Sequence, residues 1–235
     1  MTEDGKKVIM AIGGHVGDAE LTSGGVLATA SLRGDHIITV AMTGGERGTP
    51  PGMTVEDYRK QKEQEARTFA EMLGGKSIVF PYVDGELPEN DEVKLRLCDV
   101  IRKYKPDVLL THWKNSMHKD HMATHRIVKD AQFFAGLPSI QREDPAHFAA
   151  GPYYAENWED AEGYVPYTYM EVTKEGFDLW YKAISTHWFT VHSPSFHYRD
   201  YYATLMKLRG YLCRKEYAET FTIEEIQKKE VRTTF

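Results

Sequence analysis

The 235-residue chain contains only two cysteines, Cys98 and Cys213, and no long apolar run. The cysteines lie far apart and outside any C-x-x-C pair, which favours free thiols in a reducing compartment over a disulfide scaffold. The apolar runs, such as residues 8–12, are far shorter than the ~20 residues that cross a bilayer. No secretion signal precedes the first run, so we expect a cytoplasmic protein without a membrane span.

The chain also lacks an excess of positive charge. Its 29 lysines and arginines face 35 acidic residues, which gives a net charge of −6 at pH 7. This balance removes the basic surface that a nucleic-acid-binding protein normally needs. Apolar residues make up 41% of the chain and charged residues 27%, so a packed core is expected. A small neutral or polar molecule is the expected partner.

Residues 1–137 alternate short apolar runs with longer segments of helical spacing. We predict strands at 8–12, 36–42, 77–82 and 108–111, and helices at 19–33, 55–73, 93–104 and 121–135. Strands that are apolar throughout and separated by helices are typical of a parallel sheet that is covered on both faces. The sequence therefore predicts a single α/β domain with a Rossmann-like, three-layer fold and a mainly parallel sheet.

Residues 138–235 are predicted to form an irregular and helical elaboration of the same domain, with a strand at 167–172 and helices at 177–186 and 201–217. The early part of this segment is rich in aromatic residues: Tyr153, Tyr154, Trp158, Tyr164 and Tyr167. They favour packing of a loop or of a subunit interface, so a homo-oligomer is possible, although a wall for stacking sugars is the alternative. A dense run of charges at 57–67 is interpreted as a solvated helix face.

In open parallel sheets, ligands bind beyond the carboxyl ends of the strands. The turn that follows the first strand is rich in glycine, but its spacing fits neither a dinucleotide fingerprint, nor a phosphate loop, nor a serine nucleophile elbow. Instead it carries His15 and Asp18, and the turn after the fourth strand carries His118, Asp120 and His121. Two imidazoles and one carboxylate around an open position are the donors of a catalytic zinc site. A nucleotide-binding Rossmann protein stays as an alternative.

These residues resemble the de-N-acetylase family that includes N-acetylglucosaminyl-phosphatidylinositol deacetylases and the deacetylases of mycothiol and bacillithiol synthesis. The A-H-P-D-D-x-E motif of that family corresponds to GHVGDAE at 14–20, and its H-x-D-H motif to HKDH at 118–121. The resemblance implies that His15, Asp18 and His121 hold zinc or another divalent metal. It further implies two catalytic residues: His118, which polarises the acyl carbonyl, and Asp120, which orients His118.

The chain departs from the family motif at Gly17, where relatives carry the aspartate that acts as general base. Three interpretations follow: a base comes from elsewhere, with Glu20, Asp120 and His118 as candidates; the site binds a metal and a sugar without turnover; or the metal performs another reaction. A positioned base contributes about 10²–10⁴-fold, so a slow enzyme is compatible with its loss.

We predict a hydrolase that removes an N-acetyl or other N-acyl group from an amino sugar or sugar conjugate by means of a zinc-activated water. Four further residues are candidates for substrate binding. Glu46 and Arg47 follow the second strand, Asp84 follows the third, and His187 reaches the site from the carboxy-terminal elaboration. The alternative is a catalytically impaired homologue that binds zinc and carbohydrate.

Overall fold

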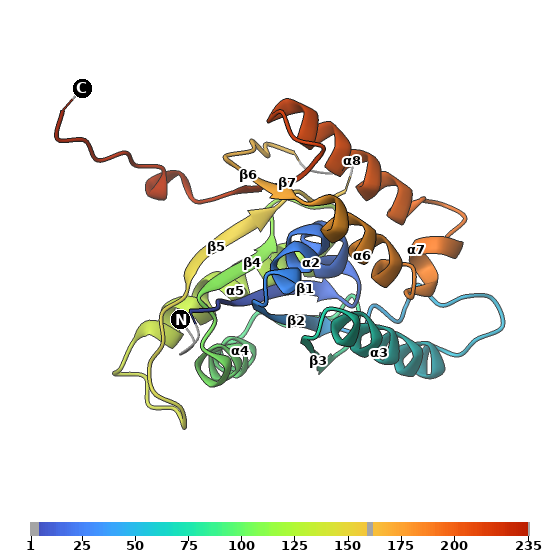
Figure 1. Cartoon of the computed structure of the whole chain (residues 1–235). Helices are drawn as coiled ribbons and strands as arrows, with labels where there is room; N and C mark the ends of the chain where they lie inside the picture. Colours follow the sequence, from blue (N-terminus) through green and yellow to red (C-terminus); the bar gives the residue numbers. More distant parts are fainter. Residues whose placement is uncertain (1–4, 159–161, 235) are drawn as a thin grey trace.

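The computed structural model describes residues 5–158 and 162–234. Residues 1–4 of the amino-terminal stretch and residues 159–161 of the predicted irregular segment lie outside this description. A seven-stranded sheet with the strand order β3-β2-β1-β4-β5-β7-β6 runs through the molecule and is flanked by helices (Figure 1). The mainly parallel α/β fold is as predicted.

The first half of the chain alternates strands and helices. Its elements are β1 (Val8–His15), α1 (Asp18–Thr22), α2 (Gly24–Leu32), β2 (His36–Thr43), α3 (Val55–Met72), β3 (Lys76–Tyr82), α4 (Asp91–Tyr104), β4 (Val108–His112) and α5 (Lys119–Gly136). The helix predicted at 19–33 is interrupted at Ser23, which lies between α1 and α2. The first strand is longer than predicted and ends at His15, so this histidine lies at the carboxyl edge of the sheet.

The second half contributes more to the sheet than the sequence predicts. Its elements are β5 (Ala150–Ala155), β6 (Thr168–Val172), α6 (Lys174–Ile184), α7 (Trp188–His192), α8 (Tyr198–Leu212), β7 (Tyr217–Thr222) and the short 3-10 helix η1 (Glu225–Gln227). β5 extends the parallel sheet beside β4, and β7 pairs antiparallel with both β5 and β6. The prediction of an irregular and helical elaboration missed β5 because Gly151 and Pro152 resemble strand breakers. It missed β7 because the predicted helix there ends at Leu212.

The side chains of β1 show why helices cover both faces of the sheet and form three layers with it. Ile9 and Ala11 point into an apolar cluster that includes residues of α2, α6 and α8, whereas Met10 and Ile12 point into a second cluster with residues of α4 and α5. Successive side chains of a strand face opposite sides, so an uninterrupted apolar run requires helices on both faces. In the described ranges, no helix combines the length and the apolar character that membrane crossing requires.

The sheet topology determines where the motifs meet. β1 pairs in parallel with β2 on one side and with β4 on the other. The sheet therefore grows outward from one edge of β1 through β2, and then from its other edge through β4. Such a reversal of strand order opens a crevice at the carboxyl ends of the two central strands. His15 ends β1 and His112 ends β4, and both therefore border this crevice.

Candidate metal centre

Three side chains from the two motifs converge at this crevice. His15 ends β1, Asp18 begins α1, and His121 lies in the first turn of α5. Asp18 Oδ2 is 3.0 Å from His15 Nδ1 and 3.1 Å from His121 Nε2, and the two nitrogens are 3.2 Å apart. The topology thus joins residues that are more than a hundred positions apart in the sequence.

The three donor atoms fit a divalent cation. Ligands of a tetrahedral zinc ion with bonds of about 2.0–2.1 Å are roughly 3.3 Å apart, close to the three separations above. Burial lowers the pKa of His121 to about 4, so its imidazole is neutral and able to donate a lone pair at pH 7. Ser116 Oγ lies 3.1 Å from the other ring nitrogen of His121 and orients the ring.

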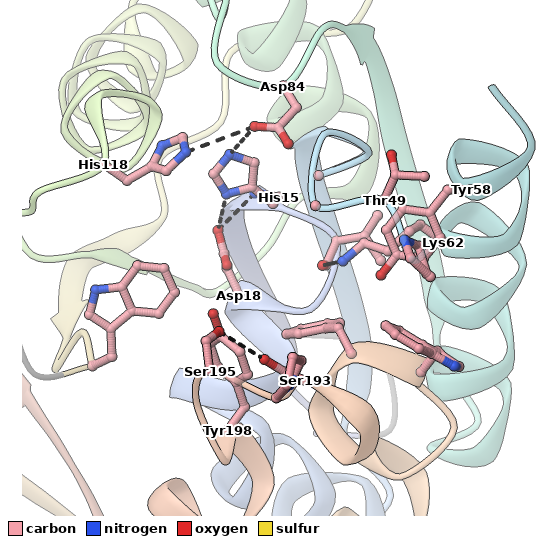
Figure 2. A pocket seen from close by; sticks show the side chains of 18 of the residues that line it. His15, Asp18, Thr49, Tyr58, Lys62, Asp84, His118, Ser193, Ser195 and Tyr198 are labelled. Carbon is pink, nitrogen blue, oxygen red and sulfur yellow. Dashed lines mark hydrogen bonds and ion pairs between the residues drawn. The ribbon is translucent and has the colours of Figure 1, made fainter. Parts of the chain in front are cut away.

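Carboxylates surround His15 on its other side. Its Nε2 lies 3.1 Å from Asp84 Oδ1 and 3.4 Å from Asp120 Oδ2 (Figure 2 shows His15 between Asp84 and Asp18). Although burial opposes the charged form, Asp18 and these two carboxylates raise the pKa of His15 well above 6.5. Three carboxylates around one imidazole attract positive charge, and a metal ion at Nδ1 would supply it. Asp84 and Asp120 are then the hydrogen-bond partners that orient a ligating histidine.

His112 belongs to this centre, although the sequence analysis assigned it no role. Its Nε2 lies 3.2 Å from Asp18 Oδ2 and accepts the backbone N–H of Gly14 at 2.9 Å. Its Nδ1 lies 2.9 Å from Asn157 Oδ1, so the ring donates to Asn157 and accepts from Gly14. The lone pair that could bind a metal is therefore already used. Stacked on His121 at a centroid distance of 4.1 Å, His112 positions the ligands instead.

His118 occupies the N-cap position of α5, beside the three donors. Its Nδ1 accepts the backbone N–H of Asp120 at 3.2 Å, and its ring centroid lies 4.4 Å from that of His15. Its side chain is 33% exposed, whereas that of Asp120 is fully buried. Burial and the neighbouring His15 lower the pKa of His118. A neutral His118 therefore carries its proton on Nε2 and offers a hydrogen-bond donor.

A cavity of about 420 Å³ opens in front of the centre. That volume suits a small molecule. Four of the residues discussed above, His15, Asp18, Asp84 and His118, line it. The rest of the lining includes Tyr58, Lys62, Trp158, Trp188, Phe189, Ser193, Ser195 and Tyr198. Of the five aromatic residues considered for sugar stacking, Trp158 lines this cavity and the other four do not.

The remaining predicted residues lie outside the cavity lining. Glu46 is buried, and its Oε1 accepts the backbone N–H of Asp84 at 3.1 Å, so it supports the loop that carries Asp84. Arg47 donates its backbone N–H to Asp84 Oδ2, but its guanidinium forms an ion pair with the exposed Glu86. His187 is fully buried, and among the described residues neither of its ring nitrogens has a hydrogen-bond partner.

Gly17, the departure from the motif, has no room for a side chain. It has a φ of +105°, a backbone conformation that residues with a side chain rarely adopt. A Cβ atom here would lie 2.5 Å from Cζ of Phe189, which belongs to α7. The ring of Phe189 thus fills the space that an aspartate would need. Glu20, one of the three substitute bases, accepts the N–H of Gly17 and does not line the cavity.

The charge run at 57–67 is not only a solvated face. Lys62 and Glu65 are buried, whereas Lys60 is exposed. Lys62 and Phe189 line the cavity but were not predicted as parts of the site, because neither belongs to a motif. The helical positions of Tyr58, Lys62, Glu65 and Phe69 follow the i, i+3, i+4 spacing of a buried face. That periodicity is the signal that could have identified Lys62.

The sequence is similar to those of known enzymes. The sequence is 30% identical to diacetylchitobiose deacetylase of Thermococcus kodakarensis over 143 residues, which are 59% of this chain and 54% of that protein. It is 24% identical to 4-oxalmesaconate hydratase of Pseudomonas putida over 217 residues, 87% of this chain and 80% of that protein. The chain thus spans about half the length of the deacetylase and most of the hydratase.

Two solved structures share the fold. The 4-carboxy-2-hydroxymuconate hydratase of Pseudomonas putida superimposes with a TM-score of 0.83 at 21% identity, covering 97% of this chain and 99% of that one. The N,N'-diacetylchitobiose deacetylase of Pyrococcus horikoshii gives 0.81 at 22% identity, covering 94% and 85%. The PIG-L family profile, described as GlcNAc-PI de-N-acetylase, matches residues 10–132 and thus both motifs. Because this match covers just over half of the sequence, the chain belongs to the PIG-L family.

Proposed function

We propose that this protein is a metal-dependent hydrolase that removes an N-acetyl or other N-acyl group from an amino sugar or sugar conjugate. The observation that carries the proposal is the triangle of His15 Nδ1, Asp18 Oδ2 and His121 Nε2, with edges of 3.0–3.2 Å, beside an open cavity. Membership of the PIG-L family and the deacetylases among its relatives support the reaction class. We take zinc as the preferred metal because two imidazoles and one carboxylate suit it.

Each residue of the centre has a distinct task in this proposal. A divalent ion held by His15, Asp18 and His121 would polarise the acyl oxygen and lower the pKa of water at its open position to about 7. His118 donates from Nε2 to the developing oxyanion, since its Nδ1 already accepts the N–H of Asp120. Asp120 thereby orients His118 through its backbone and His15 through its carboxylate.

Gly17 leaves proton removal from the attacking water without its usual base. Of the substitutes Glu20, Asp120 and His118, only His118 lines the cavity, and with its proton on Nε2 and its Nδ1 hydrogen-bonded to Asp120 it has no free nitrogen to accept a proton. We therefore expect turnover about 10²–10⁴-fold below that of a relative with the aspartate. If the loss of turnover is complete, the protein is a homologue that binds metal and carbohydrate without catalysis.

A second candidate function is hydration of a carbon–carbon double bond. It is favoured by the hydratase relative, whose match spans 87% of this chain, and by Gly17, which removes the base of the deacetylation motif. Addition of water also uses a metal centre that polarises an oxygen and a nearby proton donor. The same residues would serve, with His118 as the donor.

Parallel assays separate the functions. Zinc-loaded protein is incubated with N-acetylglucosamine and diacetylchitobiose, and acetate is measured; in a second series 4-oxalmesaconate is followed by its absorbance. The proposal expects acetate release that disappears in His121→Ala. Hydration without acetate release supports the second candidate, and one bound zinc per chain with neither reaction supports the binding protein.

A further inference from the structure

Lys62 occupies an unusual place in the cavity wall. It belongs to α3, only 4% of its surface is exposed, and it lines the cavity on the side opposite His118 (Figure 2). Its Nζ donates to the carbonyl oxygen of Val16 at 2.7 Å, within the turn that carries His15 and Asp18. The ammonium group is therefore hydrogen-bonded to the backbone segment that carries two of the proposed metal ligands.

Among the residues that the structure describes, no carboxylate forms a close ion pair with Lys62. An ammonium group has three N–H donors, and in the described part of the chain Lys62 makes one hydrogen bond, to a neutral carbonyl. Its remaining contacts are with aromatic faces, the ring of Phe189 at 4.0 Å and that of Tyr58 at 5.9 Å. Lys60, on the same helix, instead pairs with Glu56 at 2.8 Å.

Burial of such a charge is costly, since removing an ammonium from water costs several kcal/mol unless an anion compensates it. Burial lowers the pKa of Lys62, while four carboxylates beyond ion-pair distance, those of Asp18, Glu65, Glu20 and Asp84, oppose that shift. Asp18 and Asp84, the acidic residues among the described lining, contact imidazoles. Lys62 is the one lysine or arginine in that lining.

The departure at Gly17 contributes to this imbalance. A side chain at position 17 would point at Phe189, the ring over which Lys62 lies. The aspartate of the family motif would bring a carboxylate to the neighbourhood of Lys62, but this chain places a phenyl ring there. A ligand in the cavity that Lys62 lines could supply an anion at short range.

We propose that Lys62 binds a carboxylate of the substrate, so that the cavity selects an anionic small molecule whose reactive group lies at the metal centre. This inference rests on the proposed function because it places the reaction at His15, Asp18 and His121. It applies equally to an N-acylated sugar acid and to an unsaturated dicarboxylate. An ammonium group binds a carboxylate as a compact point charge, whereas the planar guanidinium of arginine binds it through two parallel hydrogen bonds. Lys62 therefore accepts carboxylates in molecules of several shapes.

The test changes the charge of the ligand and the charge of the residue in turn. Zinc-loaded protein is titrated calorimetrically with succinate, glutarate and adipate, and with the monoamide of each, which has the same shape but one charge fewer. A lost charge-assisted hydrogen bond corresponds to about 10- to 100-fold in Kd. We expect at least one diacid to bind tighter than its monoamide by that factor.

Lys62→Met, which keeps the length of the side chain, should reduce this ratio to about 1. The matched control Lys60→Met removes the same charge from an exposed position of α3 and should leave the ratio unchanged. Equal binding of diacids and monoamides by the native protein, or a preference that survives Lys62→Met, overturns the proposal.

Zinc content is measured for every variant. Loss of zinc from Lys62→Met would show that Lys62 only holds the turn through Val16, which also overturns a role in recognition. Because all readouts are binding, absence of acetate release and of hydration would defeat the proposed function without affecting this result.

Discussion

Gly17 and Phe189 are expected to be energetically coupled. Replacement of Gly17 by aspartate forces a side chain into a backbone conformation with φ +105°, which costs about 1–3 kcal/mol. The new Cβ would also lie 2.5 Å from Phe189 Cζ, and such overpacking costs about 1–3 kcal/mol more. Gly17→Asp alone should therefore lower the free energy of unfolding by about 2–6 kcal/mol, a large part of the 5–15 kcal/mol typical of domains.

Phe189→Ala removes the ring and with it the overlap. In that background Gly17→Asp should cost only the backbone part, so the double-mutant cycle should give a coupling of about 1–3 kcal/mol. Urea unfolding of the native protein, both single variants and the double variant measures it. Gly48→Asp is the matched control, because a Cβ at Gly48 meets no atom within 4 Å.

The same four proteins report on the chemistry. If the centre is a hydrolase that lacks its base, the double variant should release acetate about 10²–10⁴-fold faster than Phe189→Ala. Gly17→Asp alone should gain less, because the ring displaces the carboxylate. Strictly additive stabilities would refute the steric argument, and a measured coupling without gain of activity would refute the assignment of a missing base.

Three further predictions concern the metal and the buried charges. When the free metal is present at 100 times its Kd, its removal by a chelator should lower Tm by about 5–11 °C. His121→Ala should abolish this shift, whereas the exposed His36→Ala should not. Equal shifts in all three proteins would exclude the centre. Because the carboxylate of Asp120 orients His15, Asp120→Asn should weaken zinc binding about 10- to 100-fold in a competition titration. The exposed control Asp57→Asn should leave zinc binding unchanged. Burial lowers the pKa of His187 from 6.5 to about 3, so the unfolded chain binds a proton that the folded protein does not, and stability is lost as the pH falls from about 6.5 toward 3. Relative to the native protein, His187→Leu should therefore gain about 3 kcal/mol of stability between pH 7 and pH 4, and parallel urea curves at the two pH values would contradict this.

Much of the site was predictable because its information is local. Apolar runs that lie between helices predict a parallel sheet, and parallel strands present their carboxyl ends at one edge. His15 and Asp18 follow the first run, and His118, Asp120 and His121 follow the fourth, so their meeting follows from topology alone. Asp84, at the end of the third strand, was predicted on the same ground and lines the cavity.

Other features depend on contacts between distant segments. His112 is held by Gly14, 98 positions away, and by Asn157, which no spacing relates to it. β5 and β7 were missed because pairing with neighbouring strands overrides the weak propensity of Gly151 and Pro152 for a strand. The position of Arg47 after the second strand made it a candidate for substrate binding, and a surface ion pair was the equal alternative; its guanidinium pairs with Glu86.

The sequence by itself determined the layered fold and the meeting of the two turns that carry the histidines and aspartates, since both follow from periodicity and from position at a strand end. The resemblance to the de-N-acetylase family selected the three proposed metal ligands among them. Tertiary structure alone decided what replaces the missing aspartate and which charge faces the substrate. Phe189 reaches Gly17 from α7, and Lys62 turns inward from α3, because both positions are set by the packing of helices on the sheet. The spacing of buried positions in α3 could indicate that Lys62 faces inward. What it meets there depends on side-chain packing across the whole layer, and no local pattern predicts that.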